Sequence, residues 1–358
     1  MPGDDALSRA CQAGIGAFLL LIGLCLGGVG LYALLLTPTF AVDSSFSALP
    51  ARPTQIEDLD LEASFWQRFP EFFLPHSERR WWQMQEAVYQ VLETRRTVTI
   101  TWITRNGEPQ EQSVRIARPS LTTVLKRTWL IYWVAVLYLV SAVSVFRRHR
   151  SLPGSLLAFF LLFGALYFLS AAPVVGRGIT LPPRYFKLFI MALYIAAGGL
   201  ITLVHFAFVF PAPKGILRRF PRLPLLCYGY FFLTVTLYLS GITAFGSTFP
   251  FLCFWTLLLI ATLLHSLWTE GDRFLRKQIS LSLMAPLLVG LFFILFHLLP
   301  GVLGTTPMPF THFALFSLLL PFTLPSALDN LRLYQERLQV EHTSRQERER
   351  MRWDLHDT

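Results

Sequence analysis

The chain has 358 residues, of which 53% are hydrophobic and only 15% are charged. This balance excludes an ordinary soluble globular domain and indicates a membrane protein. The formal net charge of +9 does not indicate a nucleic-acid partner, because the basic residues form short clusters beside long apolar runs, where lipid headgroups surround them.

The first apolar run, Ala13–Leu36, predicts an uncleaved transmembrane helix rather than a signal peptide. It is long enough to span a bilayer, and it has no convincing small-residue cleavage site. The four cysteines predict no disulfide framework, since Cys25, Cys227 and Cys253 fall inside apolar runs and Cys11 lies just before the first.

About eight runs reach the length of roughly 20 apolar residues that a helix needs to cross the hydrocarbon core. They are Ala13–Leu36, Trp129–Phe146, Ser155–Val175, Leu188–Phe210, Leu223–Phe245, Pro250–Trp268, Leu281–Leu299 and Phe310–Leu328. Pro321 and Pro325 interrupt the last run and predict a kink there. We therefore expect a mainly α membrane protein of about eight transmembrane helices.

The basic loops predict the orientation, because Lys and Arg accumulate on the cytoplasmic side. Every second loop is basic, namely 147–150, 213–222 and 272–277. Two outer segments run against this pattern, the stretch 176–187 and the pair Lys126–Arg127. On balance we expect both termini in the cytoplasm and residues 37–128 outside the plasma membrane.

The outer stretch predicts a small α/β domain that contains a β-hairpin. Its first strand, Thr97–Thr104, alternates Val98, Ile100 and Trp102 on one face, and Gln112–Ala117 alternates in the same way. Asn106 and Gly107 between the strands supply the positive φ angles that a tight hairpin turn requires.

A helix is predicted upstream of this hairpin, from Ser77 to Glu93. Trp81, Met84, Val88 and Leu92 recur at helical spacing, and Ser77 is available as the N-cap. The helix and hairpin together resemble the second half of a PDZ-like domain, a module that binds an extended peptide along a sheet edge. The alternative is a small α/β ectodomain with an unrelated ligand or none.

Histidines are the only ionisable residues near the middle of the predicted spans, which disfavours a transporter. His205 and His265 lie near the cytoplasmic ends of their runs, and His297 and His312 near the outer ends. Such pairs would suit haem or metal ligation. The stronger interpretation is that each histidine is held at the interface by one hydrogen bond.

After Leu328 the composition changes to a charged tail with Leu331, Tyr334 and Leu338 on one stripe. A continuous helix here would extend roughly 45 Å into the cytoplasm. The stripe is too narrow to fold alone, so we expect a partner helix, most simply that of a second copy. A solvated helical face is the alternative for 341–350.

The tail ends on a histidine, His356, flanked by Asp354 and Asp357. An adjacent carboxylate can accept the Nδ1 proton and leave Nε2 as a nucleophile, able to attack the γ-phosphorus of ATP. In phosphoryl transfer the protein mainly positions and neutralises, so a helix presenting one oriented imidazole suffices on the acceptor side.

The box "ERERMRWDLHDT" (347–358) resembles the phosphoacceptor box of bacterial sensor histidine kinases coupled to LuxR/NarL-type response regulators. Met351 stands in place of the usual aliphatic residue, and Arg352 and Trp353 depart from the small-then-basic pair. The resemblance implies that His356 is autophosphorylated and that Asp357 orients it and accepts its proton. It also implies that the phosphoryl group passes to a response regulator.

Three membrane segments, "LVHFAFVFPAPKG" (203–215), "DRFLRKQISLSL" (272–283) and "LPFTLPSALDNLRLY" (320–334), are similar to multi-span sensor kinases of the type of the competence kinase ComP. An outer PDZ-like insert between the first two spans also occurs in that group. Such kinases bind ATP and Mg²⁺ in a domain after the dimerisation helices. We expect the chain to be the N-terminal part of a kinase, lacking that domain.

The expected organisation is therefore a first segment and span (1–36), the ectodomain (37–128), a seven-helix bundle (129–328) and the start of a dimerisation and phosphotransfer domain (329–358). The expected partners are a second copy, a response regulator, membrane lipids and an unidentified extracellular or membrane ligand. Two rivals remain: a non-enzymatic membrane receptor, and a haem or ion-handling membrane protein.

Overall fold

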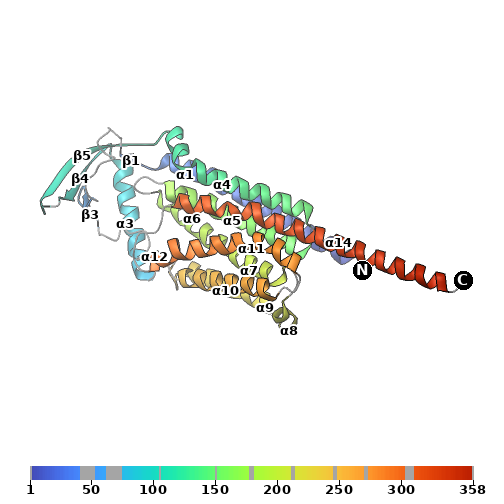
Figure 1. Ribbon diagram of the computed structural model, residues 1–358. Coiled ribbons are helices and arrows are strands. Elements are labelled where there is room, and N and C mark those ends of the chain that lie inside the picture. Colours follow the sequence, from blue (N-terminus) through green and yellow to red (C-terminus); the bar gives the residue numbers. More distant parts are fainter. Residues whose placement is uncertain are drawn as a thin grey trace.

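The computed structural model describes residues 2–40, 53–61, 75–104, 106–149, 151–176, 181–210, 214–244, 248–269, 273–302 and 310–356. These residues form a helical bundle with a small sheet at one end, and the last helix projects from the opposite end (Figure 1). Both chain ends lie on that opposite side.

Five helices are long and apolar enough to cross a membrane, so the chain is a mainly α, multi-pass membrane protein. They are Gly14–Leu36, Leu121–Arg148, Leu152–Val174, Pro183–Val209 and Phe310–Tyr334. Three shorter apolar helices, Leu223–Leu239, Phe251–Ser266 and Met284–Phe296, fall within the remaining predicted runs.

The helices of the bundle have the following bounds: α1 Pro2–Leu36, α4 Leu121–Arg148, α5 Leu152–Gly176, α6 Pro183–Ala196, α7 Gly198–Val209, α8 Gly215–Arg219, α9 Leu223–Leu239, α10 Thr248–Thr269, α11 Arg273–Phe293, α12 Leu299–Val302, α13 Phe310–Ser317 and α14 Leu319–His356. A π-helical turn, Ile294–Leu298, joins α11 to α12. The fourth predicted run is divided at Ala197 into α6 and α7. The last run is divided at Leu318, just before the two prolines that predict a kink.

Close helix contacts in the bundle depend on glycine. A Cβ atom on Gly164 of α5 would lie 2.5 Å from the Tyr138 ring of α4, and one on Gly30 of α1 would lie 2.5 Å from Pro173 of α5. Small residues let helix backbones approach closely in a bilayer, where packing rather than the hydrophobic effect drives association. These contacts place α5 between α1 and α4.

The stretch that we expect to be the ectodomain, and refer to by that name, contains a sheet of five antiparallel strands in the order β1-β5-β4-β2-β3. Their bounds are β1 Thr39–Phe40, β2 Gln55–Ile56, β3 Leu59–Asp60, β4 Thr97–Ile103 and β5 Pro109–Ala117. The predicted alternation on β4 is confirmed, since Val98, Ile100 and Trp102 are all buried.

The predicted hairpin is confirmed, and so is the positive φ expected at Gly107, which is +82°. The Thr104 N–H donates to Glu108 O at 2.9 Å, and the Gly107 N–H donates to Thr104 O at 3.0 Å. Glycine supplies the left-handed position of this turn without the steric cost of a side chain. The positive φ expected at Asn106 stays a prediction, because it depends on Arg105, which lies outside the described residues.

The predicted helix is confirmed as α3, Pro75–Thr94, which begins two residues earlier than expected. Val88 and Leu92 pack on the sheet, as their spacing predicts. Trp81 instead belongs to a cluster of the membrane bundle, with its ring centroid 5.3 Å from that of Phe186 on α6. The helix therefore lies between the sheet and the bundle (Figure 1). Because the helix already begins at Pro75, Ser77 lies inside α3 and its predicted N-cap role is wrong.

The sheet is joined to the bundle by adjacent strands. β1 follows α1 after two residues, and β5 precedes α4 by three. Thr39 pairs with Ala117, and the Thr39 hydroxyl donates to Ala117 O at 3.0 Å. The outer ends of α1 and α4 are thus held together by one strand pair.

Candidate functional site

The predicted phosphoacceptor lies at the end of α14. This helix runs from Leu319 to His356 without interruption, so the backbone of His356 continues a helix that starts inside the bundle. The side chains of Asp354 and His356, and all of Asp357, fall outside the described residues. The expected contact between His356 and Asp357 therefore stays a prediction.

The apolar stripe predicted on the tail is divided between two environments. Leu331 and Tyr334 are half-buried and pack against the main core of the bundle. Leu333 and Val340, seven residues apart, are 56% and 66% exposed. The side chain of Leu338 is outside the described residues. The free apolar side of the tail thus includes Leu333 and Val340, which the sequence interpretation did not single out.

Two prolines determine how α14 begins. Proline has no backbone N–H, so in a helix it leaves the carbonyl four residues earlier without its usual donor. Pro321 withholds the donor from Ser317 O, and Pro325 withholds it from Pro321 O. Both carbonyls lie in a membrane-spanning segment, where water cannot replace the missing hydrogen bond.

Two side chains of α4 supply the missing donors. The Tyr138 hydroxyl donates to Ser317 O at 2.9 Å, and the Ser141 hydroxyl donates to Pro321 O at 3.2 Å. Tyr138 is only 2% exposed, and Gly164 gives its ring room on the other side. The break that the prolines make in the last span is thereby converted into a specific attachment to α4.

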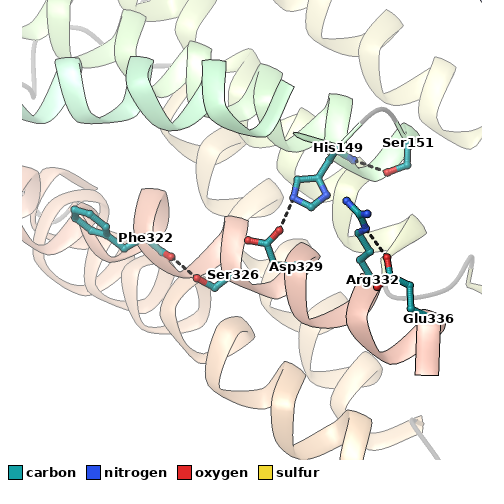
Figure 2. A network of polar contacts seen from close by, with 8 residues as sticks. His149, Ser151, Phe322, Ser326, Asp329, Arg332 and Glu336 are labelled. Carbon is teal, nitrogen blue, oxygen red and sulfur yellow. Dashed lines mark hydrogen bonds and ion pairs between the residues drawn. The ribbon is translucent and has the colours of Figure 1, made fainter. Parts of the chain in front are cut away.

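A third polar contact follows at the membrane boundary. His149, the C-cap residue of α4, lies with its Nε2 3.0 Å from Asp329 Oδ1 of α14 (Figure 2). The histidine side chain is 7% exposed and the aspartate 48%. One partner is therefore fixed inside the protein while the other borders solvent, and the contact is the third of these polar contacts between α4 and the region of α14.

His149 is itself held by its surroundings. Its backbone N–H donates to Val145 O at 2.8 Å. A Cβ atom on Gly154, in the first turn of α5, would lie 2.5 Å from both the Cβ and the carbonyl oxygen of His149, so this close approach requires glycine. One turn further along α14, Arg332 and Glu336 form an exposed ion pair at 2.8 Å.

We call these three contacts the α4–α14 seam: Tyr138 with Ser317, the last residue of α13, and then Ser141 with Pro321 and His149 with Asp329, both on α14. Residue numbers increase together on the two sides, so the paired segments run parallel from the ectodomain end toward the tail. Since α4 follows β5 directly, the seam connects the ectodomain sheet to the helix that carries His356. A displacement of α4 along or around its axis would act on α14 through two contacts and on the end of α13 through the third.

The sequence interpretation missed the seam residues, although part of the signal was present. The spacing Pro-x-x-x-Pro at 321 and 325 identifies two carbonyls that need donors from another helix. It does not identify which helix provides them. The partnership of His149 with Asp329 joins residues 180 positions apart, and no local pattern predicts it.

The outer end of the bundle holds a second polar group. Glu78 of α3 is 7% exposed and accepts hydrogen bonds from Trp82 Nε1 at 3.2 Å and from the Tyr238 hydroxyl of α9 at 3.3 Å. The Tyr238 ring stacks on that of Tyr194 of α6, with centroids 4.8 Å apart. The ectodomain helix is thus bonded to the membrane helices.

A cavity of about 490 Å³ lies beside this pair of tyrosines, and Tyr194 forms part of its wall. The other described lining residues come from α9, α10 and the segment between them: Tyr230, Thr234, Leu237, Thr243, Phe251 and Phe254. Its size is that of a site for a small molecule, and none of these seven side chains is charged.

Of the two histidine pairs that would suit haem or metal ligation, only the pair His205 and His265 has both side chains within the described residues. His205 Nδ1 lies 3.3 Å from the Tyr228 hydroxyl, which fits the interpretation of a single interfacial hydrogen bond. His265 and His312 are exposed, and the side chain of His297 is not described. Within the described ranges no group of three or more His, Cys, Asp or Glu side chains could hold a metal ion.

Comparison of the chain with protein-family models, with curated proteins and with solved structures gives no match.

Proposed function

We propose that this chain is the sensory and membrane part of a dimeric bacterial sensor histidine kinase, with His356 as the phosphoryl acceptor. In this proposal the five long and three shorter apolar helices are eight spans. Both termini are cytoplasmic, and the ectodomain is a PDZ-like module on the outer side. The phosphoryl group passes from His356 to a LuxR/NarL-type response regulator.

The observation that carries the proposal is the α4–α14 seam. Input at the ectodomain reaches α4 through β5. α4 is bonded at two points to the helix that ends at His356 and at a third, Ser317, to the helix just before it. A receptor that only captured a ligand would need no such attachment between its ectodomain and a helix projecting about 40 Å beyond the bundle. A kinase whose tail must turn or shift needs one.

The chemistry proposed for the tail is simple. Nε2 of His356 attacks the γ-phosphorus of ATP, the bond to the β-phosphate oxygen breaks, and ADP leaves. Asp357 keeps the imidazole in the productive tautomer and takes up its proton. ATP and Mg²⁺ would be held by a kinase catalytic domain, and this chain would contribute only the oriented imidazole and its carboxylate.

Signalling also requires a ligand that binds two packings of the bundle with different affinities. The cavity beside Tyr194 supports a ligand site in the outer half of the bundle, next to the hydrogen bond between Tyr238 and Glu78. A ligand that displaced Tyr194 would disturb the stacked pair and so the contact between α3 and α9.

The proposal is tested by reconstituting the chain in lipid vesicles with a histidine-kinase catalytic domain, fused after Thr358 or added separately, and radiolabelled ATP. We expect acid-labile label on the wild-type tail and none on His356→Gln. His342→Gln, the same change on the same tail, should retain the label. Labelling that persists in His356→Gln would overturn the assignment of the acceptor.

The second candidate function is a non-enzymatic receptor whose tail recruits a separate effector. The cavity favours it, since a binding site needs no phosphoacceptor. It predicts that the wild-type tail takes no label from any supplied catalytic domain, and that His356→Gln leaves effector recruitment unchanged.

A further inference from the structure

The segment 214–222, between α7 and α9, has a mixed exposed surface. It includes α8, which lies at the end of the bundle remote from the ectodomain (Figure 1). Ile216 is 47% exposed and Phe220 55%, and the two are joined by the hydrogen bond from the Phe220 N–H to Ile216 O at 2.8 Å. Large apolar side chains are thus exposed where the bundle meets its boundary with water.

Exposed cations surround these apolar side chains. Arg218, Arg219 and Arg222 are exposed, and the Arg219 guanidinium lies 5.6 Å from the centre of the Phe220 ring. Leu217 packs against the main core of the bundle and fixes the segment to it. The surface is therefore anchored, and it presents cationic and apolar groups together.

The three arginines also lack acidic partners within the described residues. Elsewhere in the chain, Arg95 pairs with Glu57 in the ectodomain and Arg332 pairs with Glu336 on α14, so arginine is paired where a carboxylate is near. No such carboxylate is paired with Arg218, Arg219 or Arg222 among the described side chains. As far as the described side chains go, their positive charge is therefore available to an anion that the protein binds.

We propose that the segment 214–222 is a binding site for the phosphate headgroups of anionic lipids. Ile216 and Phe220 enter the boundary between headgroups and acyl chains, while the guanidinium forks bind lipid phosphate oxygens. An anionic lipid suits both features, because its phosphate binds the arginines and its acyl chains contact the apolar side chains. A free phosphate would bind only the arginines. The inference goes beyond the proposed kinase function and stands if that function fails.

The test uses the full chain in nanodiscs of phosphatidylcholine with increasing phosphatidylglycerol, and counts the phosphatidylglycerol molecules retained after transfer to detergent. The variant Arg218→Gln/Arg219→Gln should weaken the preference for phosphatidylglycerol about fivefold for each cation removed. Arg218→Lys/Arg219→Lys keeps the charge but not the fork, and should have a smaller effect.

The matched control is Lys126→Gln/Arg127→Gln, which removes two exposed charges from α4 at the opposite end of the bundle. It should leave the preference unchanged. An equal loss in this control, or an unchanged preference in Arg218→Gln/Arg219→Gln, would overturn the site. Full competition by inorganic phosphate would identify a soluble-anion site instead and would also overturn the lipid assignment.

Discussion

The two sides of the bundle are built differently. On the side of α4, α5 and α14, Tyr138 and Phe168 are almost fully buried, and hydroxyl groups of one helix complete the backbone hydrogen bonds of another. On the side of α9 and α10, Phe231 is the buried residue of α9, and a cavity separates the helices. The first side is fixed by specific contacts, and the second leaves space.

This difference suggests that the two sides have different functions, transmission of a displacement on one and ligand binding on the other. A seam with three polar contacts moves as one body or breaks at identifiable points, so it suits the transmission of a displacement. A side with a cavity can accept a ligand without first breaking a packed core. Glu78 and the stacked tyrosines connect the two sides of the bundle. Through Glu78, α3 is bonded to α9 on the side with the cavity, and α3 also packs on the sheet that leads into α4 on the other side.

The largest expected effect comes from adding a single methyl group on the tightly packed side of the bundle. Gly164→Ala places a Cβ atom 2.5 Å from the Tyr138 ring and forces the ring or the helix to move. We expect a loss of about 1–3 kcal/mol in the free energy of unfolding. A lowered midpoint of thermal unfolding in detergent measures it.

The control for this prediction is Gly229→Ala on α9, where a Cβ atom would have no neighbour within 4 Å. Alanine there should be neutral or stabilise the helix by up to about 1 kcal/mol. If both variants lower the midpoint equally, the contrast between the two sides is not real.

The next effect concerns the seam and its prolines. Tyr138→Phe leaves Ser317 O without its donor inside the bundle, which should cost about 1–2 kcal/mol. In a Pro321→Ala background the residue at 321 regains an N–H for that carbonyl, so the same change should cost less than about 0.5 kcal/mol.

A double-mutant cycle of Tyr138→Phe and Pro321→Ala, measured by thermal unfolding, checks this compensation. Strictly additive effects would show that the tyrosine hydroxyl does not replace the proline's missing donor.

The smallest effect is expected at the boundary with water. Asp329→Ala removes the partner of His149, but the aspartate is half-exposed, so stability should fall by only about 0.5–1 kcal/mol. The larger consequence is positional: the distance between spin labels on Arg147 and Arg337 should become more broadly distributed.

Glu336→Ala is the comparison for that measurement, because it breaks an ion pair within α14 and not across the seam. It should leave the distance distribution narrow. A similar broadening in both variants would argue that the contact between His149 and Asp329 does not position the tail.

Much of this architecture follows from local patterns in the sequence. The alternation of Val98, Ile100 and Trp102 predicts β4, and the helical spacing of Val88 and Leu92 predicts α3, because each pattern is a direct result of the geometry of one element. Proline at 321 and 325 predicts the irregular last span for the same reason.

The remaining features depend on contacts between distant parts of the chain. The spacing that places Trp81 on the same stripe as Val88 does not distinguish a sheet partner from a membrane helix, and only the fold shows that Trp81 packs on Phe186. His149 reads as one more basic residue of a cytoplasmic loop. Its burial against Asp329 depends on how α4 and α14 lie together.

The pairing of Thr39 with Ala117 has an engineering consequence. Neighbouring strands lie about 4.8 Å apart, so the chain enters and leaves the module that contains the sheet through two adjacent points. A module inserted in this way can be exchanged without separating the helices beneath it. Any foreign domain whose ends form an antiparallel strand pair becomes a candidate for grafting, and such chimaeras would let α4 report on an input of the experimenter's choosing.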